Sequence, residues 1–231
     1  MRISLSLFVS IVTLTGAPLP SGAEQPPGPT DPASSAPRVK TCGESFSKNS
    51  TEEFNKKCIA WAGPLAAMRG ETLVLRMDDG TRKVFDNKKG SGASEGGFGY
   101  GLADFYPSRH IFIVCDHGVD AGTCKAIDGR TGREQDYGYA LPQLSPGGDW
   151  ALTVEYGEDG LTASNFTILD ARAEKPLAVW TSKASKTRLP AKSKFVAWID
   201  DKTVELTSPG QKPVFLIRAP DGRWGVSETS Q

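Results

Sequence analysis

The sequence has few of the side chains on which most catalytic and metal sites depend. Only two of its 231 residues are histidine, His110 and His117, and only four are cysteine. Imidazole is the most frequent general base and a common zinc ligand, so the chain offers little material for either kind of site. We therefore expect no cofactor, no metal and no enzymatic activity.

An excess of charge of one sign is also missing. The 27 lysines and arginines balance the 27 aspartates and glutamates, and no long run of either sign occurs. Nucleic acids and anionic lipids are attracted by a strongly basic field, which this chain lacks. The composition predicts a protein or small-ligand partner, no nucleic acid, and no membrane anchor.

A long hydrophobic run occurs only near the N-terminus. Arg2 precedes an apolar stretch from Ile3 to Thr15, which is too short to span a bilayer and is followed by small residues up to Ala23. This pattern is typical of a secretory signal peptide over residues 1–23. Residues 24–41 are rich in Pro, Gly and Ser and predict a disordered leader. We expect a soluble protein that is periplasmic or secreted.

The four cysteines form two near pairs. Cys42 and Cys58 are 58 − 42 = 16 residues apart, and Cys115 and Cys124 are 124 − 115 = 9 residues apart. Three connectivities are possible, and the short intervals favour the disulfides Cys42–Cys58 and Cys115–Cys124 in an exported, oxidised protein.

A helix is predicted from Ser50 to Trp61, because Ser50 can cap it and Gly63-Pro64 would end it. One face of this helix carries Phe54, Cys58 and Trp61. Residues 42–69 are therefore predicted to form a disulfide-linked helical segment that covers one end of a sheet.

From residue 70 to 231 the pattern is that of β-strands. An Asp-Gly turn at Asp78-Asp79-Gly80-Thr81 separates two β-rich stretches and predicts a hairpin. A Gly-rich, Ser-rich loop follows from Asp86 to Gly97. The sequence then alternates strand, hairpin, strand, turn and strand, and a proline precedes each start by four or five residues: Pro107, Pro146, Pro190 and Pro220. The spacings 146 − 107 = 39 and 190 − 146 = 44 are near the roughly 40-residue period of propeller blades.

Two of these starts, Ser145-Pro146-Gly147-Gly148-Asp149-Trp150 and Ala219-Pro220-Asp221-Gly222-Arg223-Trp224, resemble the Ser-Pro-Asp-Gly lead-in of bacterial WD-like and Tol-type β-propeller repeats. The resemblance implies a small all-β, propeller-like array of about four antiparallel three-stranded sheets. It also implies that the last strand, at Trp224, pairs with the first unit to close a ring. An open β-meander or a β-sandwich is the alternative.

One loop gathers polar donors. Asp116, His117 and Asp120 lie between Cys115 and Cys124, in a hairpin that a disulfide would preorganise. Two carboxylates and one imidazole are too few for calcium, so these residues are candidates for binding a partner or, alternatively, form an ordinary solvated hairpin tip. His110 begins an apolar strand and is interpreted as a strand-end residue satisfied by the backbone.

A possible nucleophile occurs in Gly92-Ala93-Ser94-Glu95-Gly96, which matches Gly-x-Ser-x-Gly. No helix follows Ser94, and no histidine follows residue 117 to complete a triad. We therefore predict an exported binding or scaffold protein. The alternatives are a secreted hydrolase that uses Ser94 or the Asp116/His117/Asp120 loop, and an inhibitor or immunity-type protein that inserts a loop into an enzyme.

Overall fold

The computed structural model of the chain describes residues 42, 51–87, 99–117, 123–157, 163–185 and 189–227, and the side chains of residues 51–54, 117 and 164 lie outside this description. The described residues together form one compact unit. The predicted signal peptide and leader lie outside the described residues.

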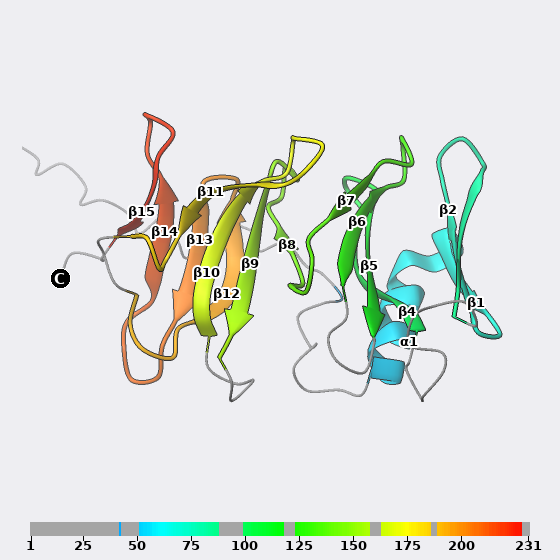
Figure 1. Ribbon diagram of the computed structural model, residues 1–231, viewed down its shortest axis with the longest axis horizontal. Helices are drawn as coiled ribbons and strands as arrows, with labels where there is room; N and C mark the ends of the chain where they lie inside the picture. The colour runs from blue at the N-terminus through cyan, green and yellow to red at the C-terminus, as the bar shows by residue number, and fades with distance from the viewer. Residues whose placement is uncertain are drawn as a thin grey trace, which may run out of the picture. The chain divides into compact units, whose positions relative to one another are not determined.

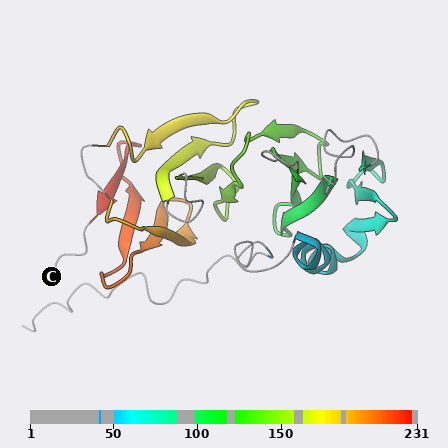
Figure 2. The same ribbon diagram turned by 60° about the horizontal axis from the view of Figure 1, so that its bottom comes forward.

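The predicted helix is present as α1, Thr51–Ala62, and the predicted disulfide joins Cys58 on this helix to Cys42. Gly63 ends the helix because its φ of 59° is left-handed, and a short 3-10 helix, η3 (Gly63–Leu65), follows. Cys58 and Ala62 are buried, but Trp61, on the predicted apolar face, is 47% exposed. Figures 1 and 2 show the helix against the second sheet, where Asn55 Oδ1 accepts the N–H of Leu102 at 3.0 Å.

Four antiparallel sheets follow, and in each one the strands pair in chain order. The first sheet contains β1 (Ala66–Arg69), β2 (Thr72–Arg76) and β3 (Arg82–Asp86). The second contains β4 (Gly99–Tyr106), β5 (Ile111–His117), β6 (Cys124–Asp128) and β7 (Glu134–Asp136). The third contains β8 (Gln143–Leu144), β9 (Trp150–Tyr156), β10 (Ala163–Asp170) and β11 (Leu177–Thr181). The fourth contains β12 (Lys194–Asp200), β13 (Thr203–Thr207), β14 (Val214–Arg218) and β15 (Trp224–Ser227).

The all-β class and the number of sheets are confirmed, but three of the sheets have four strands rather than three. Sequence analysis missed β4, which is interrupted by glycine, and β8, which has only two residues. The first sheet also begins earlier than expected, at Ala66, because β1 pairs with β2.

The four prolines do not mark equivalent corners. Pro107 and Pro146 lie between the first and second strands of their sheets, Pro190 precedes β12, and Pro220 lies between the third and fourth strands. The feature that recurs at the same place in the second, third and fourth sheets is instead an Asp-x-Arg turn, which joins the third strand to the fourth. In each turn the arginine N–H donates to the aspartate carboxylate, at 2.8 to 3.0 Å, in Asp128/Arg130, Asp170/Arg172 and Asp221/Arg223.

The predicted ring closure is also wrong. β15 pairs with its neighbour β14, with Trp224 opposite Arg218, and not with the hairpin of the first sheet. The contacts described between sheets join sheets that are consecutive in the chain. β15 is the fourth strand of the fourth sheet, so it is not available to extend the first sheet.

Two hydrophobic cores lie between the sheets. Side chains of the first and second sheets and of α1 form one core, which also includes Leu144 and Ala151 of the third sheet. Side chains of the third and fourth sheets form the other, which includes Trp150, Trp198 and Trp224. The third sheet therefore contributes to both cores, and these three tryptophans pack inside the second one.

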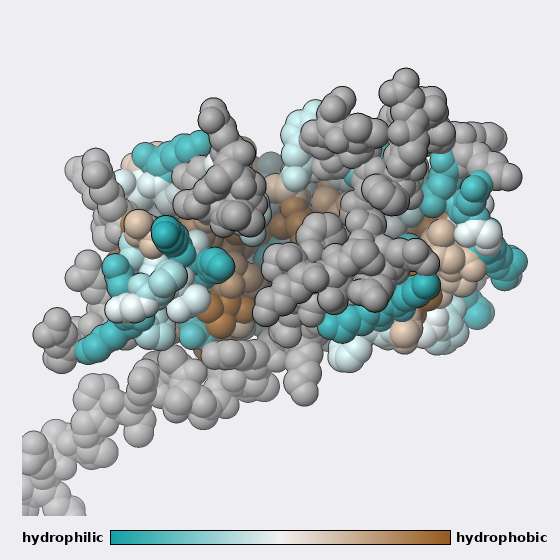
Figure 3. All heavy atoms as spheres, turned by 90° about the horizontal axis from the view of Figure 1, so that it is seen from below, coloured by the Kyte–Doolittle hydropathy of each residue, from teal (hydrophilic) through white to brown (hydrophobic). Residues whose placement is uncertain are grey.

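The sheets have two different ends. One end, here called the turn end and uppermost in Figure 1, carries the connections 77–81, 107–110, 129–133, 145–149, 171–176, 201–202 and 219–223. The opposite end is here called the loop end, and it carries the other strand ends with the described parts of their connections: residues 70–71, 87, 123, 137–142, 157, 182–185, 189–193 and 208–213. Figure 3 views the molecule from the loop end, where hydrophobic side chains are visible near the middle of the face.

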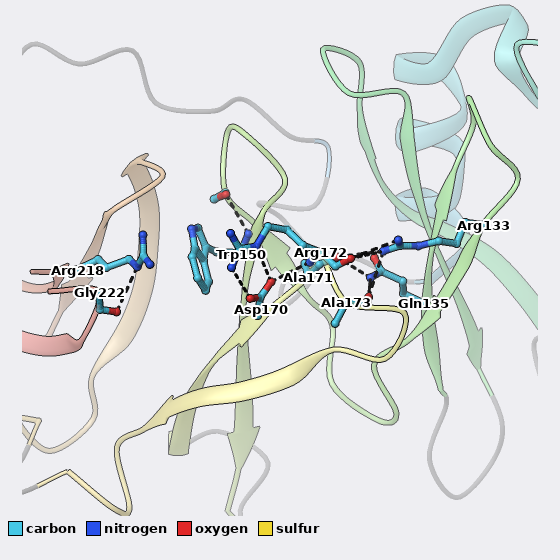
Figure 4. A network of polar contacts seen from close by, with 10 residues as sticks. Arg133, Gln135, Trp150, Asp170, Ala171, Arg172, Ala173, Arg218 and Gly222 are labelled. Carbon is cyan, nitrogen blue, oxygen red and sulfur yellow. Dashed lines mark hydrogen bonds and ion pairs between the residues drawn. The ribbon is translucent and has the colours of Figure 1, made fainter. Parts of the chain in front are cut away.

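Each pair of successive sheets is joined at the turn end. The Asp78 N–H donates to Gly129 O at 2.8 Å between the first and second sheets, and the Gly147 N–H donates to Asp201 between the third and fourth. Between the second and third, Arg133 and Gln135 donate to main-chain carbonyls of Ala171 and Ala173. Figure 4 shows the contacts of Arg133 and Gln135 from close by.

Trp150 occupies the centre of the junction between the third and fourth sheets. The guanidinium groups of Arg172 and Arg218 stack on opposite faces of its ring, 4.9 and 4.6 Å from the centroid (Figure 4). The ring of Trp224 approaches it edge-on with centroids 5.8 Å apart. Cation–π and aromatic contacts of this kind are stabilising, so the first residue of β9 helps to hold two sheets together.

In the described part of the chain, the structure contains no helix that is long and apolar enough to cross a membrane.

Candidate functional site

The second predicted disulfide forms the base of a hairpin at the loop end. Cys115 on β5 and Cys124 on β6 lie directly opposite each other, with Cα atoms 4.1 Å apart. Beside them the Asp116 N–H donates to Thr123 O at 2.8 Å. The connection that leaves this hairpin therefore starts from a fixed base.

The predicted binding residues of this hairpin occupy different surroundings. Asp116 is buried within the sheet, opposite Tyr100 of β4, rather than displayed at the tip. The backbone of His117 ends β5, but its side chain and all of Asp120 lie outside the described residues. A shared binding role for the three therefore stays a prediction.

A tyrosine that sequence analysis did not single out lies next to this disulfide. The Cys124 N–H donates to Gly138 O at 2.7 Å, and the Tyr137 N–H donates to Cys124 O at 2.9 Å. Gly138 has a left-handed φ of 62°, and its N–H is held by Asp136 at 2.8 Å. These bonds fix the backbone that presents Tyr139, whose side chain is 76% exposed.

Tyr137 takes the opposite position, inside the core. Its hydroxyl is buried, with no hydrogen-bond partner among the described residues, and burial raises the pKa of the phenol. Tyr137 is thus packed in the core, whereas Tyr139, two residues later in the same connection, is exposed to solvent.

The third sheet supplies a second fixed base at the loop end. The buried Asn165 accepts hydrogen bonds at its Oδ1 from the Thr181 hydroxyl at 2.7 Å and from the Ser182 hydroxyl at 2.9 Å. Tyr156 is the last residue of β9 and is 59% exposed. The carboxylate of the preceding residue, Glu155, forms an ion pair with the Lys183 ammonium at 3.0 Å. Because the Asn165 amide is buried and bonded, its Asn-x-Thr sequence does not present an accessible acceptor for glycosylation.

Two exposed tyrosines therefore lie at the loop end. Tyr139 follows backbone that is hydrogen-bonded to Cys124, and Tyr156 ends β9, where it pairs with Ala163 of β10. Tyrosine offers a large amphipathic contact area with few rotatable bonds. The candidate nucleophile Ser94 lies outside the described residues, so the hydrolase alternative stays untested.

His110 has a structural position at the turn end. The expectation that the backbone satisfies its side chain was wrong, because its Nδ1 pairs with the Asp78 carboxylate of the first sheet at 2.5 Å. Its ring packs against Phe105 and Phe112, and its Nε2 is buried without a hydrogen-bond partner among the described residues. Because its Nε2 is buried, the imidazole is not accessible to a substrate. The His110–Asp78 pair instead links the second sheet to the first.

One group of three potential metal ligands occurs among the described residues, formed by Cys42, Cys58 and Asp104. The two sulfur atoms are bonded to each other, so they are not available as thiolate ligands.

Comparison with known proteins gives no family for this chain. No protein-family model matches the sequence, and no curated protein matches it. Among solved structures, an acylaminoacyl peptidase from Pyrococcus horikoshii aligns with 12% sequence identity and a TM-score of 0.37. The alignment covers 71% of this chain and 29% of the peptidase, so the chain spans less than a third of that protein. A similarity this low carries no argument about fold or function.

Sequence reasoning missed Tyr139, Tyr156 and Asn165 as features of the loop end. For Tyr139 the available signal was the Asp136-Tyr137-Gly138 turn beside a cysteine pair. For Asn165 no local signal existed, since its partners lie on the neighbouring strand β11 and just beyond it.

Proposed function

We propose that this is an exported, periplasmic or secreted protein that works by binding a protein partner through its loop end. The observation that carries the proposal is the exposure of Tyr139 and Tyr156 at this end: Tyr139 follows backbone that is hydrogen-bonded to Cys124, and Tyr156 is paired with Ala163 in the third sheet. Rigid aromatic side chains dominate many binding surfaces because little entropy is lost when they are buried. A scaffold of paired strands that holds a few connections in place is a common basis for such surfaces.

Export is supported by the signal-peptide pattern of residues 1–23 and by two disulfides, which persist in oxidising compartments. The kinship with propeller repeats belongs to the same proposal. It is supported by four successive antiparallel sheets that share apolar cores with their neighbours.

The experiment is affinity capture from a periplasmic extract or culture medium with the immobilised exported protein. We expect at least one partner to be retained, and we expect Tyr139→Ala and Tyr156→Ala each to lower its retention by roughly tenfold or more. The matched control is Leu177→Ala, which removes a side chain that is similarly exposed on the edge strand β11.

The proposal fails if no partner is retained while a known binding protein succeeds under the same conditions. It also fails if the two tyrosine variants retain the partner as well as the unchanged protein does. Equal losses in Leu177→Ala and the tyrosine variants would show that the loop end is not the specific surface.

A further inference from the structure

The second and third sheets each pack between two neighbours, whereas the first and the fourth each pack against one. Within the described part of the chain, one face of the first sheet and one face of the fourth therefore have no sheet against them. These two surfaces are here called the outer faces. The burial of single strands follows this position, because every residue of β4 except Tyr100 is buried, whereas all five residues of β3 are exposed or half-buried.

The outer face of the first sheet carries a row of apolar side chains. Successive residues of a strand point to opposite faces, and Leu73 and Phe85 point into the first core, so Val74 and Val84 lie on the other face. Val74 is opposite Val84 on one side and Ala67 on the other, so the row crosses all three strands. Val84 is 59% exposed. The charged residues on this face are Arg76 and Arg82 toward the turn end, and Arg69 and Asp86 toward the loop end.

The outer face of the fourth sheet also combines apolar and charged side chains. Phe215 and Ile217 lie on this face, because Leu216 between them points into the second core. Ile217 is 37% exposed, and it is paired with Gly225, where an added Cβ would meet no atom within 4 Å. Space is therefore open beside Ile217. The charged residues on this face are Asp200 toward the turn end, Glu205 in the middle and Lys194 toward the loop end.

The two outer faces are complementary in charge. Three arginines and one aspartate lie on the first, and two acidic residues and one lysine lie on the second. If the two faces pack with their turn ends on the same side, as successive sheets do within the chain, Arg76 and Arg82 approach Asp200, and Asp86 approaches Lys194. Two copies of the first outer face would instead bring arginines together, and such contacts between like charges are unfavourable.

We infer that two copies of this chain associate head to tail, with the outer face of the first sheet of each copy packed on the outer face of the fourth sheet of the other. This contact joins two different surfaces, so a closed pair contains it twice. It gives each end sheet a second neighbour, as the second and third sheets already have. The association uses surfaces other than the loop end and does not depend on the partner proposed above.

The test is the mass of the exported protein in solution, measured by sedimentation velocity over a range of concentrations. We expect a species of two chains that dissociates reversibly on dilution. Val84→Arg and Ile217→Arg each place a charge in one outer face, so we expect each to weaken self-association by about a hundredfold or more. The matched control is Val179→Arg on the edge strand β11, where the valine is 44% exposed and lies on neither outer face, and its effect should stay within about threefold.

A mixture of the two arginine variants distinguishes head-to-tail pairing from symmetric pairing. A Val84→Arg chain keeps an unaltered fourth sheet and an Ile217→Arg chain keeps an unaltered first sheet, so together they can form one unaltered contact. We therefore expect the mixture to associate at least about tenfold more tightly than either variant alone. Circular dichroism of each variant shows that it is folded.

Four results would overturn the inference. The first is an unchanged protein that stays a single chain at every concentration, and the second is assembly that continues beyond two chains. The third is self-association that survives in Val84→Arg or in Ile217→Arg, or that is lost equally in Val179→Arg. The fourth is a mixture that associates no better than its separate components.

Discussion

The turn end and the loop end of the sheets are built from the same strands but differ in what holds them. At the turn end, short connections bond to the next sheet, through Asp78 to Gly129, through Arg133 to Ala171 and through Gly147 to Asp201. At the loop end, the described contacts of the connections stay mainly within one sheet, as in the Cys115–Cys124 hairpin. The comparison indicates that the turn end joins the sheets, whereas the loop end presents side chains to solvent.

The largest effect should follow from removing the centre of one junction. Trp150→Ala deletes a buried ring that contacts Arg172, Arg218 and Trp224, so we expect the free energy of unfolding to fall by about 3–5 kcal/mol. Denaturant unfolding followed by tryptophan fluorescence and by far-UV circular dichroism measures this loss. A loss below about 1 kcal/mol would show that this junction does not hold the third and fourth sheets together.

A smaller loss is expected from crowding another junction. A methyl group on Gly129 would lie 2.6 Å from the imidazole of His110, so Gly129→Ala must displace the ring that pairs with Asp78. We expect a destabilisation of about 1–3 kcal/mol in thermal or denaturant unfolding. The control is Gly225→Ala on β15, where an added methyl meets no atom within 4 Å and should change stability by less than about 0.5 kcal/mol. Similar values for both variants would contradict the role of His110.

The Asp-x-Arg turns should make a modest, pH-dependent contribution. Hydrogen bonds from Arg172 hold the pKa of Asp170 below its usual value, so this carboxylate stabilises the fold above its unfolded pKa, and the stabilisation is lost as the pH falls through its folded pKa. Asp170→Asn should therefore lower stability by about 1 kcal/mol or less at pH 7. The difference from the unchanged protein should vanish near about pH 2, which unfolding curves at the two pH values can check. A difference that persists at low pH would mean that the charge is not responsible.

The smallest effect on stability is expected at the loop end. Tyr139→Ala and Tyr156→Ala remove exposed side chains, so the free energy of unfolding should change by less than about 0.5 kcal/mol, although partner binding falls. Differential scanning calorimetry of the two variants gives the stability. A destabilisation of about 2 kcal/mol or more would place these tyrosines in the packing of the fold and remove the contrast between the two ends.

Local sequence signals predicted the local parts of this architecture. The hairpin at Asp78–Thr81, both disulfides and the helix near Cys58 each depend on residues close together in the chain, and all of them are present. Secondary structure of this kind is encoded by turn residues and by short-range periodicity, which a single sequence displays.

Contacts between sheets could not be read in the same way. The prolines mark turns, but a turn residue does not reveal which strands of a sheet it joins, and Pro220 lies at a different corner from Pro146. Arg133 bonds to carbonyl oxygens some forty residues away, and Tyr106 bonds to Leu144 across a sheet boundary. The pairing of β15 was predicted wrongly because β4 and β8 were not recognised. With only three strands assigned to each sheet, the last strand had no partner in its own sheet and was assigned to the first one.

The candidate site was predicted only in part. The Cys115–Cys124 hairpin was singled out for its polar residues, yet Asp116 is buried and the exposed Tyr139 beside the hairpin went unnoticed. Exposure depends on which side of a connection faces the core, and a sequence shows this only where strands or helices alternate regularly.

Amide hydrogen exchange is the most direct test of the division between the two ends. The amides of Asp78, Gly129 and Ala171 all donate to backbone carbonyls in turn-end connections, whereas Tyr139 projects from a loop-end connection. We predict that the three turn-end amides exchange only with global unfolding, whereas the amide of Tyr139 exchanges many times faster. Exchange of the turn-end amides at the rate of the Tyr139 amide would contradict the account.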